Sequence, residues 1–160
     1  MKKIIFILLT ALFLSCSSDS ATEQNNPTNN DNLVGKWKLT KEVYYNTTLS
    51  TSQTRLADAC EDLSYNKYNV DGTFTLVSYD ANGSGGCDLI PSTLEYANWL
   101  KLSPTTYKFT SKFTGETEET YNETISFEDN NNTLIVHENQ SGSYNGQPYN
   151  NSSAFYTKIN

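Results

Sequence analysis

The 160-residue chain is acidic, with 18 Asp and Glu residues against 11 Lys and Arg, and its formal net charge is −7. Two of the lysines, Lys2 and Lys3, belong to an N-terminal leader, so its removal leaves a net charge of −9. This excess of negative charge repels phosphate backbones and argues against nucleic acid as a partner.

Residues 1–15 have the features of a secretory signal peptide. Lys2 and Lys3 precede an apolar run over residues 4–14, which is shorter than the roughly 20 residues that a membrane span needs. Phe13-Leu14-Ser15-Cys16 resembles the lipobox of bacterial lipoproteins, in which the cysteine is acylated and becomes the first mature residue. The resemblance implies a lipid on Cys16 and hence a membrane partner; the alternative is a secreted protein in which Cys16 is incidental.

Residues 16–32 read as a flexible stalk between the lipid and a folded domain. The stretch after Cys16 is rich in Ser, Asn and Thr and contains no large apolar side chain, so it cannot bury enough surface to offset its ordering entropy. Asp19-Ser20-Ala21 resembles the O-glycosylation motif of the Bacteroidetes, and chance explains so short a match equally well.

Cys60 and Cys87 form the remaining cysteine pair. In an oxidising export compartment a disulfide is the expected state of such a pair. Closing this loop of 27 residues would stabilise the fold by about 3.5 kcal/mol. A metal pair is the competing interpretation, but neither a CxxC spacing nor a nearby histidine supports it, and we expect no metal and no cofactor.

Alternation of apolar and polar residues dominates the chain after residue 32 and predicts β-strands. In the first of them Trp37 lies between Lys36 and Lys38, so the indole faces inward while both lysines stay in water. Asp71-Gly72 predicts a type I′ hairpin turn. We expect loops over 46–62, with a helical turn near 55–59, and over 80–92. The predicted strands cover residues 33–45, 63–70, 73–79, 94–102, 105–113, 121–127, 133–139 and 153–159.

Eight strands joined in sequence by mostly short connections predict an all-β domain over residues 33–160. Eight antiparallel strands suffice to close an up-and-down β-barrel, which removes exposed sheet edges. A flattened β-sandwich is the alternative that the periodicity leaves open.

Leu33-Val34-Gly35-Lys36-Trp37 resembles the Gly-x-Trp start of the lipocalin first strand. The domain more closely resembles lipocalin-like lipoproteins of the Bacteroidetes, through Cys60, the stretch YNVDGTFTL over 68–76, Cys87, Trp99 and the ending YTKIN. This resemblance implies that Trp37 closes one end of the barrel and that Gly35 lets the chain pass closely beneath it. Classical lipocalins place an arginine from near the last strand over this ring; this sequence departs there, since Arg55 is its only arginine and Lys158 is the nearest substitute.

Ligand binding in such a barrel would use inward-facing side chains, for which we select Leu39, Lys41, Tyr107, Phe109 and Glu123. Along their strands, Lys41 and Glu123 stand at the alternating positions that apolar residues also occupy, so both are predicted to face inward. An isolated charge inside a barrel is costly unless it is paired or hydrated. Either the two charges orient the polar end of a ligand in a cavity, or a bulge or the barrel mouth brings them to solvent.

Two further sequence patterns could indicate a catalytic residue or a metal site. His137 stands in a strand without a nucleophile motif, and we expect it to face solvent. The stretch from Asp80 to Gly85 begins like a calcium loop, but Pro91 occupies the position of the bidentate glutamate, which favours a disulfide-held lid or hairpin.

The leading functional expectation is a membrane-anchored, lipocalin-like binder of a small apolar or amphipathic molecule at the cell envelope, on the outer membrane by family analogy. The alternative is a packed barrel that serves as an interaction or assembly module and presents tyrosine-rich loops such as 144–149 to a protein partner whose identity stays open. We expect no enzymatic activity, because no acid-base pair or nucleophile motif is visible.

Overall fold

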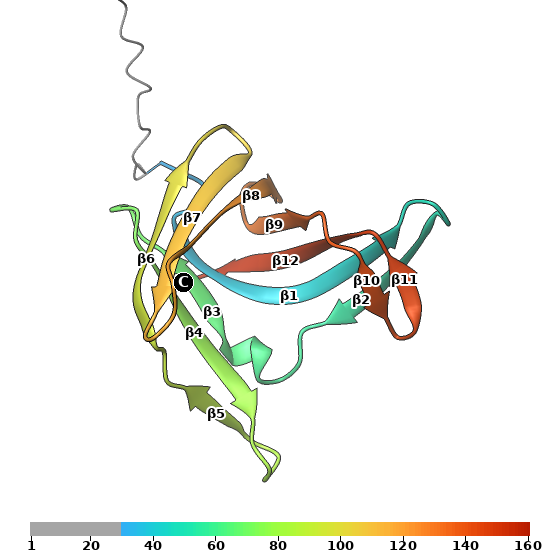
Figure 1. Ribbon diagram of the computed structural model, residues 1–160, viewed down its shortest axis with the longest axis horizontal. Coiled ribbons are helices and arrows are strands. Elements are labelled where there is room, and N and C mark those ends of the chain that lie inside the picture. The colour runs from blue at the N-terminus through green and yellow to red at the C-terminus, as the bar shows by residue number, and fades with distance from the viewer. Residues whose placement is uncertain (1–29) are drawn as a thin grey trace, which may run out of the picture.

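The computed structural model describes residues 30–160, so the predicted signal peptide, Cys16 and most of the predicted stalk lie outside the described residues. Figure 1 shows that strands dominate the described part of the chain. Its only helical element there is the short 3-10 helix η1 (Glu61–Leu63). No helix in this part of the chain combines the length and apolarity needed to cross a bilayer. The strands are β1 (Gly35–Asn46), β2 (Thr51–Leu56), β3 (Tyr65–Tyr68), β4 (Phe74–Ala81), β5 (Cys87–Ile90), β6 (Leu94–Lys101), β7 (Thr106–Phe113), β8 (Glu119–Glu128), β9 (Thr133–Glu138), β10 (Gly142–Tyr144), β11 (Gln147–Tyr149) and β12 (Asn151–Ile159).

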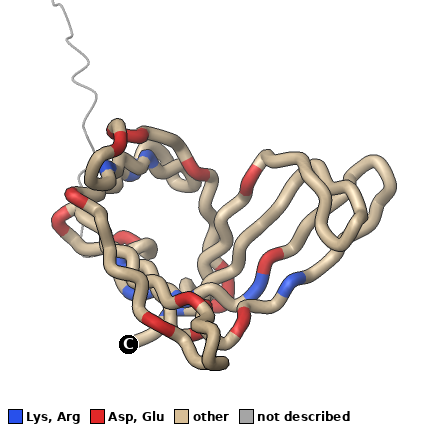
Figure 2. The backbone as a smooth tube through the Cα atoms, turned by 60° about the horizontal axis from the view of Figure 1, so that its bottom comes forward, with Lys and Arg blue, Asp and Glu red and all other residues tan. Residues whose placement is uncertain are grey.

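The main sheet is a strongly curled antiparallel meander in the order β5-β4-β3-β1-β12-β9-β8-β7-β6, with β2 also paired to β1. The first and last strands are neighbours, and the sheet curls into the ring seen in Figure 2. This architecture confirms the predicted all-β, barrel-like fold rather than the flattened sandwich. The ring is incomplete between β4 and β6, where it is joined by a bridge between Thr73 and Asn98 and by the hydrogen bond from Trp99 N to Gly72 O at 2.7 Å.

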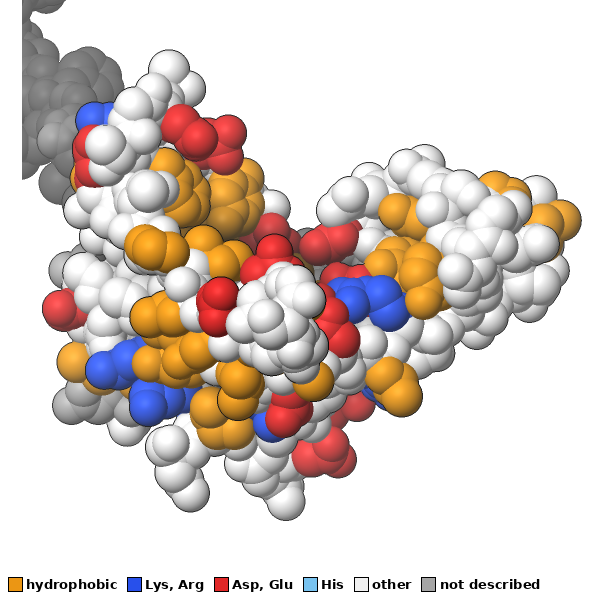
Figure 3. Space-filling view, turned by 90° about the horizontal axis from the view of Figure 1, so that it is seen from below, with side chains coloured by type: hydrophobic (Ala, Val, Ile, Leu, Met, Phe, Trp, Pro, Cys, Tyr) orange, Lys and Arg blue, Asp and Glu red, His pale blue; other side chains and the backbone are white. Residues whose placement is uncertain are grey.

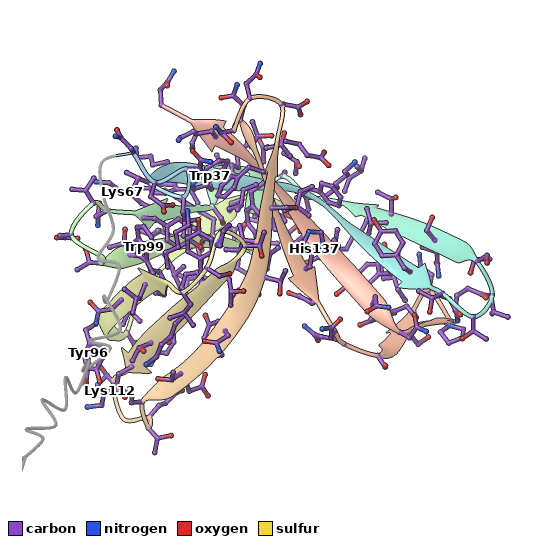
Figure 4. All side chains as sticks on the ribbon, turned by 90° about the horizontal axis from the view of Figure 1, so that it is seen from above. Trp37, Lys67, Tyr96, Trp99, Lys112 and His137 are labelled. Atoms are coloured by element: carbon purple, nitrogen blue, oxygen red, sulfur yellow. A yellow bond between two sulfur atoms is a disulfide. The ribbon has the colours of Figure 1, made fainter. Side chains whose placement is uncertain are left out.

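The core fills the end of the barrel where β1 begins. Leu33, Trp37 and Tyr107 are completely buried there, and Trp99 and Phe109 are nearly so. Trp37 and Trp99 lie in the crowded interior of the curled sheet, while Tyr96 and Lys112 lie toward the outer ends of β6 and β7 (Figure 4). The inward direction predicted for Trp37 is therefore confirmed, whereas Lys36 and Lys38 on the other face are half-buried rather than fully in water.

Contacts of the barrel begin before residue 33, inside the segment that was predicted as stalk. Asp31 Oδ2 lies 3.0 Å from Lys101 Nζ, and the Tyr107 hydroxyl donates to Asp31 Oδ1 at 3.1 Å. The same carboxylate accepts a hydrogen bond from Leu33 N at 2.9 Å. Asp31 thus fixes the entry of the chain beneath the barrel end.

The second half of β1 leaves the barrel and forms an arm with β2 and the separate β10–β11 hairpin (Figure 1). Tyr44 packs between the rings of Tyr144 and Tyr149, with centroid distances of 4.6 and 4.8 Å. Arg55 ties the arm to η1, because its guanidinium lies 2.8 Å from Glu42 and 2.7 Å from Glu61. The hydrogen bonds from Arg55 lower the pKa of both carboxyls.

Three local predictions were wrong. The loop predicted over 46–62 contains β2 instead, and no helical turn forms at 55–59. The loop predicted over 80–92 contains β5; the disulfide-held hairpin favoured for the stretch from Asp80 to Gly85 is confirmed, since β5 pairs with β4. The turn at Asp71-Gly72 is not type I′, because Gly72 has a positive φ of 83° while Asp71 does not; Gly72 N bonds back to Asn69 O at 3.1 Å.

Cys60 and Cys87 form the predicted disulfide, with their Cα atoms 5.4 Å apart. The bond joins the start of η1 to the first residue of β5. Because β5 is an edge strand paired only with β4, the disulfide is its second attachment to the barrel.

Candidate functional site

The candidate site is a pocket of about 230 Å³ on the concave side of the curled sheet, which we call the aromatic pocket. Its walls come from β3, β4, β7, β8, β9 and β12. Its lining residues are Asn66, Tyr68, Phe74, Leu76, Phe109, Ser111, Phe113, Glu119, Tyr121, Glu123, Ile125, Val136, Glu138 and Tyr156.

Aromatic side chains supply most of the apolar wall. Tyr68, Phe74 and Phe109 pack together with ring centroids 5.7 to 6.0 Å apart, and Tyr121 stacks on Phe109 at 5.7 Å. These rings continue the core toward the pocket, so the pocket floor is fixed by the same contacts that hold the barrel together. Burial raises the pKa of the Tyr68 and Tyr156 phenols, which therefore remain protonated.

Three carboxylates line the pocket, Glu119 and Glu123 from β8 and Glu138 from the neighbouring strand β9. Glu138 on β9 accepts hydrogen bonds from Ser152 Oγ at 2.8 Å and from Gln140 Nε2 at 2.6 Å. Glu123 on β8 makes no ion pair or side-chain hydrogen bond with any residue of the described range. Burial, together with the charge of Glu138, raises the pKa of Glu123 to about 7. At neutral pH this side chain can hold either a proton or a charge.

A second, polar pocket of about 290 Å³ adjoins the first at Glu138 and lies between barrel and arm, lined also by Glu42, Tyr44 and Ser152. Figure 3 shows the notch between these two parts of the molecule, with acidic side chains gathered at its base and hydrophobic side chains on the barrel side. The aromatic pocket thus lies beside an acidic surface.

Two of the five residues selected for ligand binding line the aromatic pocket, namely Phe109 and Glu123. Leu39 instead lines a different pocket, of about 250 Å³, next to Trp37. Tyr107 does not line the aromatic pocket; it is fully buried in the core and its hydroxyl bonds to Asp31. Phe109 and Tyr107 share one face of β7, so strand parity alone does not separate a pocket residue from a core residue.

Lys41 faces away from the aromatic pocket, and the prediction that it shares the inward face of Trp37 was wrong. The pairing of β1 with β12 shifts between Leu39 and Lys41, so Thr40 is the extra residue of a β-bulge and the alternation inverts after it. Lys41 Nζ lies 4.5 Å from the ring centroid of Phe155, the neighbour of the pocket residue Tyr156. The bulge alternative is confirmed for Lys41.

Trp37, Gly35 and Lys158 come together at the end of the barrel beneath the core. Trp37 Nε1 donates to Leu33 O at 2.7 Å, and Lys158 Nζ lies 5.1 Å from the Trp37 ring centroid. Gly35 has φ +137°, and a Cβ there would come within 2.7 Å of Lys158 Cε. The close approach at Gly35 is therefore made by the lysine that covers the indole.

His137 faces solvent, as predicted, on the convex side of the sheet. Its ring nitrogens lie 2.8 Å from Ser126 Oγ and 3.2 Å from Ser153 Oγ. Both Ser126 and His137 alternate with pocket-facing neighbours on their strands, so this pair is on the side opposite the aromatic pocket. Within residues 30–160, no group of three or more His, Cys, Asp or Glu side chains is placed to hold a metal ion.

Sequence reasoning missed several residues of the pocket, above all Tyr68, Tyr121 and Tyr156. Tyr121 was identifiable, since it shares the parity of Glu123 on β8. Tyr156 belongs to the last strand, and only the pairing of β12 beside β9 brings it near Glu138. No family model matches this chain, and no curated protein matches it either.

Proposed function

We propose that this protein is a membrane-anchored, lipocalin-like binding protein of the cell envelope, which holds a small apolar or amphipathic molecule in the aromatic pocket. The observation that carries the proposal is the pocket itself: a concave site walled by aromatic rings with a few polar groups is the usual form of a small-molecule site. Its 230 Å³ is below the usual range of about 300 to 1,000 Å³, so the expected ligand is small.

Two features support the lipocalin-like part of the proposal. The meander places its first and last strands side by side, and the Gly35, Trp37 and Lys158 contacts close one end of the barrel. The membrane anchor rests on the sequence of residues 1–16, with attachment through Cys16 and the outer membrane as the proposed location.

The alternative of a ligand-free interaction module gains no support from the tyrosine-rich segment 144–149. Within the arm Tyr144 stacks on Tyr44 and Tyr149 packs against it at a tilt, so their rings are largely engaged by the chain itself. The proposal also treats the protein as a binder rather than an enzyme.

Native mass spectrometry of the full chain, purified from membranes and incubated with lipid and metabolite extracts of its host, tests the proposal. We expect a discrete added mass that disappears on denaturation, and a covalent acyl mass on Cys16 that survives it. Ser111→Leu should abolish the dissociable mass, because Ser111 is buried in the pocket wall and a larger side chain fills the space.

Thr110→Leu is the matched control, since Thr110 lies on the other face of β7 and bonds to Thr120 Oγ1 at 3.1 Å. Bare protein in every extract would contradict the binding function. An added mass that Ser111→Leu retains would place the ligand outside the aromatic pocket.

A further inference from the structure

The lining of the aromatic pocket carries negative charge without a compensating cation. Glu119, Glu123 and Glu138 line it, whereas none of its described lining residues is Lys, Arg or His. Glu138 is held in place by Ser152 and Gln140, and its charge acts on Glu123. A neutral hydrocarbon would leave the repulsion between Glu123 and Glu138 unchanged, whereas a bound cation would reduce it.

The aromatic rings of the pocket receive no lysine ammonium from the described chain, whereas four rings outside the pocket do. Four rings outside the pocket lining each carry a lysine ammonium within 5.3 Å of the centroid. No such pair involves Tyr68, Phe109, Tyr121 or Tyr156 among residues 30–160. The four pairs are Lys36–Tyr65, Lys41–Phe155, Lys101–Tyr107 and Lys158–Trp37. The pocket therefore offers π-faces that attract a cation but receive none from the described chain.

Polar atoms inside the pocket are likewise left for a ligand. Within the described range, the Tyr156 hydroxyl and the Glu123 carboxylate have no side-chain hydrogen-bond partner, although burial raises the pKa of both groups. Tyr121 and Tyr156 are close enough to Glu123 for its charge to raise their pKa values. The unpartnered acid and the phenols therefore converge from β8 and β12 on one part of the pocket.

We propose that the aromatic pocket binds an organic ammonium ion, a protonated or quaternary amine on a small apolar body, with the cation at Glu123 and Glu138 and the hydrocarbon among Tyr68, Phe74 and Phe109. This inference rests on the proposed function and names the ligand class of the same site. Ion pairing to the two carboxylates and contact with the rings combine the two interactions by which proteins recognise alkylammonium groups. An acidic ligand is disfavoured by the same charges.

Calorimetric titration of the full chain in nonionic micelles at pH 8, with micelles alone as the blank, tests the inference. The probes are 2-phenylethylammonium, its trimethylammonium analogue and the neutral 2-phenylethanol, which share one aromatic body. We expect both cations to bind at least about tenfold more tightly than the alcohol. Glu123→Gln, and separately Glu138→Gln, should remove that preference.

Glu128→Gln is the charge-matched control, because Glu128 lies on the same strand but outside the pocket lining, and it should keep the preference. Near-ultraviolet circular dichroism confirms that each variant is folded. Equal binding of alcohol and cations would overturn the ammonium inference while the binding function stands. The ammonium inference would also be overturned if both pocket variants kept the preference for the cations, or if the cations did not bind at millimolar concentration. The mass spectrometry experiment with extracts tests the binding function separately.

Discussion

Glu123 couples the charge of the pocket to the stability of the fold. Its pKa is raised from 4.5 to about 7 by burial and by Glu138, so the folded chain binds a proton that the unfolded chain releases between these values. The free energy of unfolding therefore falls as pH rises from about 4.5 to about 7. Above that range the titration of Glu123 causes no further loss. Glu123→Gln should remove this loss.

We expect Glu123→Gln to be more stable than the native chain by about 1 to 2 kcal/mol at pH 8, after allowance for water in the pocket, and equal to it at pH 4. Urea unfolding at pH 4, 6 and 8 measures the difference. Both proteins contain the other acids and phenols that face this site, so the titration of these groups largely cancels from the difference in unfolding free energy. They are Glu119, Glu138, Tyr68, Tyr121 and Tyr156. A gain that is the same at all three pH values would contradict the titration of Glu123.

Gly35 is the residue at which the barrel end tolerates no side chain. Its φ of +137° is strained for any other residue, and an added Cβ would displace Lys158 from the Trp37 ring. Gly35→Ala should lower the free energy of unfolding by about 2 kcal/mol in urea titration and change the Trp37 fluorescence. Gly83→Ala is the control, since its Cβ would meet nothing within 4 Å. Equal stability of the two variants would refute this role.

At the scale of elements, the disulfide is expected to matter most for β5. This edge strand has four residues and pairs only with β4, so Cys60–Cys87 supplies its covalent attachment to η1. The double substitution Cys60→Ser, Cys87→Ser should lower the free energy of unfolding by about 3 kcal/mol in urea. A reductant should produce the same loss in the native chain and none in the variant; stability that the reductant leaves unchanged would show that the bond contributes little.

The eight predicted strands correspond to strands of the sheet because their alternation reflects a face that is buried. The elements that were missed lack this signal. The strand β2 reads Thr-Ser-Gln-Thr-Arg-Leu and forms because β1 offers it a partner. The four residues of β5 include Leu89 and Ile90, which are both exposed, and β10 and β11 have three residues each. The bulge at Thr40 leaves no mark in the residue pattern either, since it arises from the pairing of β1 with β12. One inserted residue was enough to reverse the predicted face of Lys41.

The pocket was accessible to sequence reasoning only in part. Parity correctly placed Phe109 and Glu123 on inward faces, because both lie in regular stretches of β7 and β8. Whether an inward aromatic ring fills the core or lines a pocket depends on its depth in the barrel. Tyr107 lies deep, beside Trp99 at a centroid distance of 6.0 Å, whereas Phe109 is two residues nearer the pocket.

For the whole molecule, the incomplete closure of the barrel between β4 and β6 predicts where it opens. Strands β1, β12 and β9 are paired on both sides, whereas β6 pairs only with β7 apart from the bridge to Thr73. Trp99 spans the gap, since its indole N–H lies 3.2 Å from Asn69 O and 3.1 Å from Thr73 O. Native-state hydrogen exchange should therefore be slowest in β1, β9 and β12 and faster across the gap.

Trp99→Phe removes the indole N–H while keeping an aromatic ring in the core, and it leaves the carbonyls of Asn69 and Thr73 without that donor. We expect exchange at the start of β4 and in β6 to accelerate more than exchange in β12. Tyr107→Phe is the control, because it removes a hydrogen bond to Asp31 at the barrel base rather than one across the gap. Its effect should follow the global loss of stability at every strand. If Trp99→Phe instead accelerated hydrogen exchange equally in all strands, the gap would open only when the whole barrel unfolds, which would contradict this prediction.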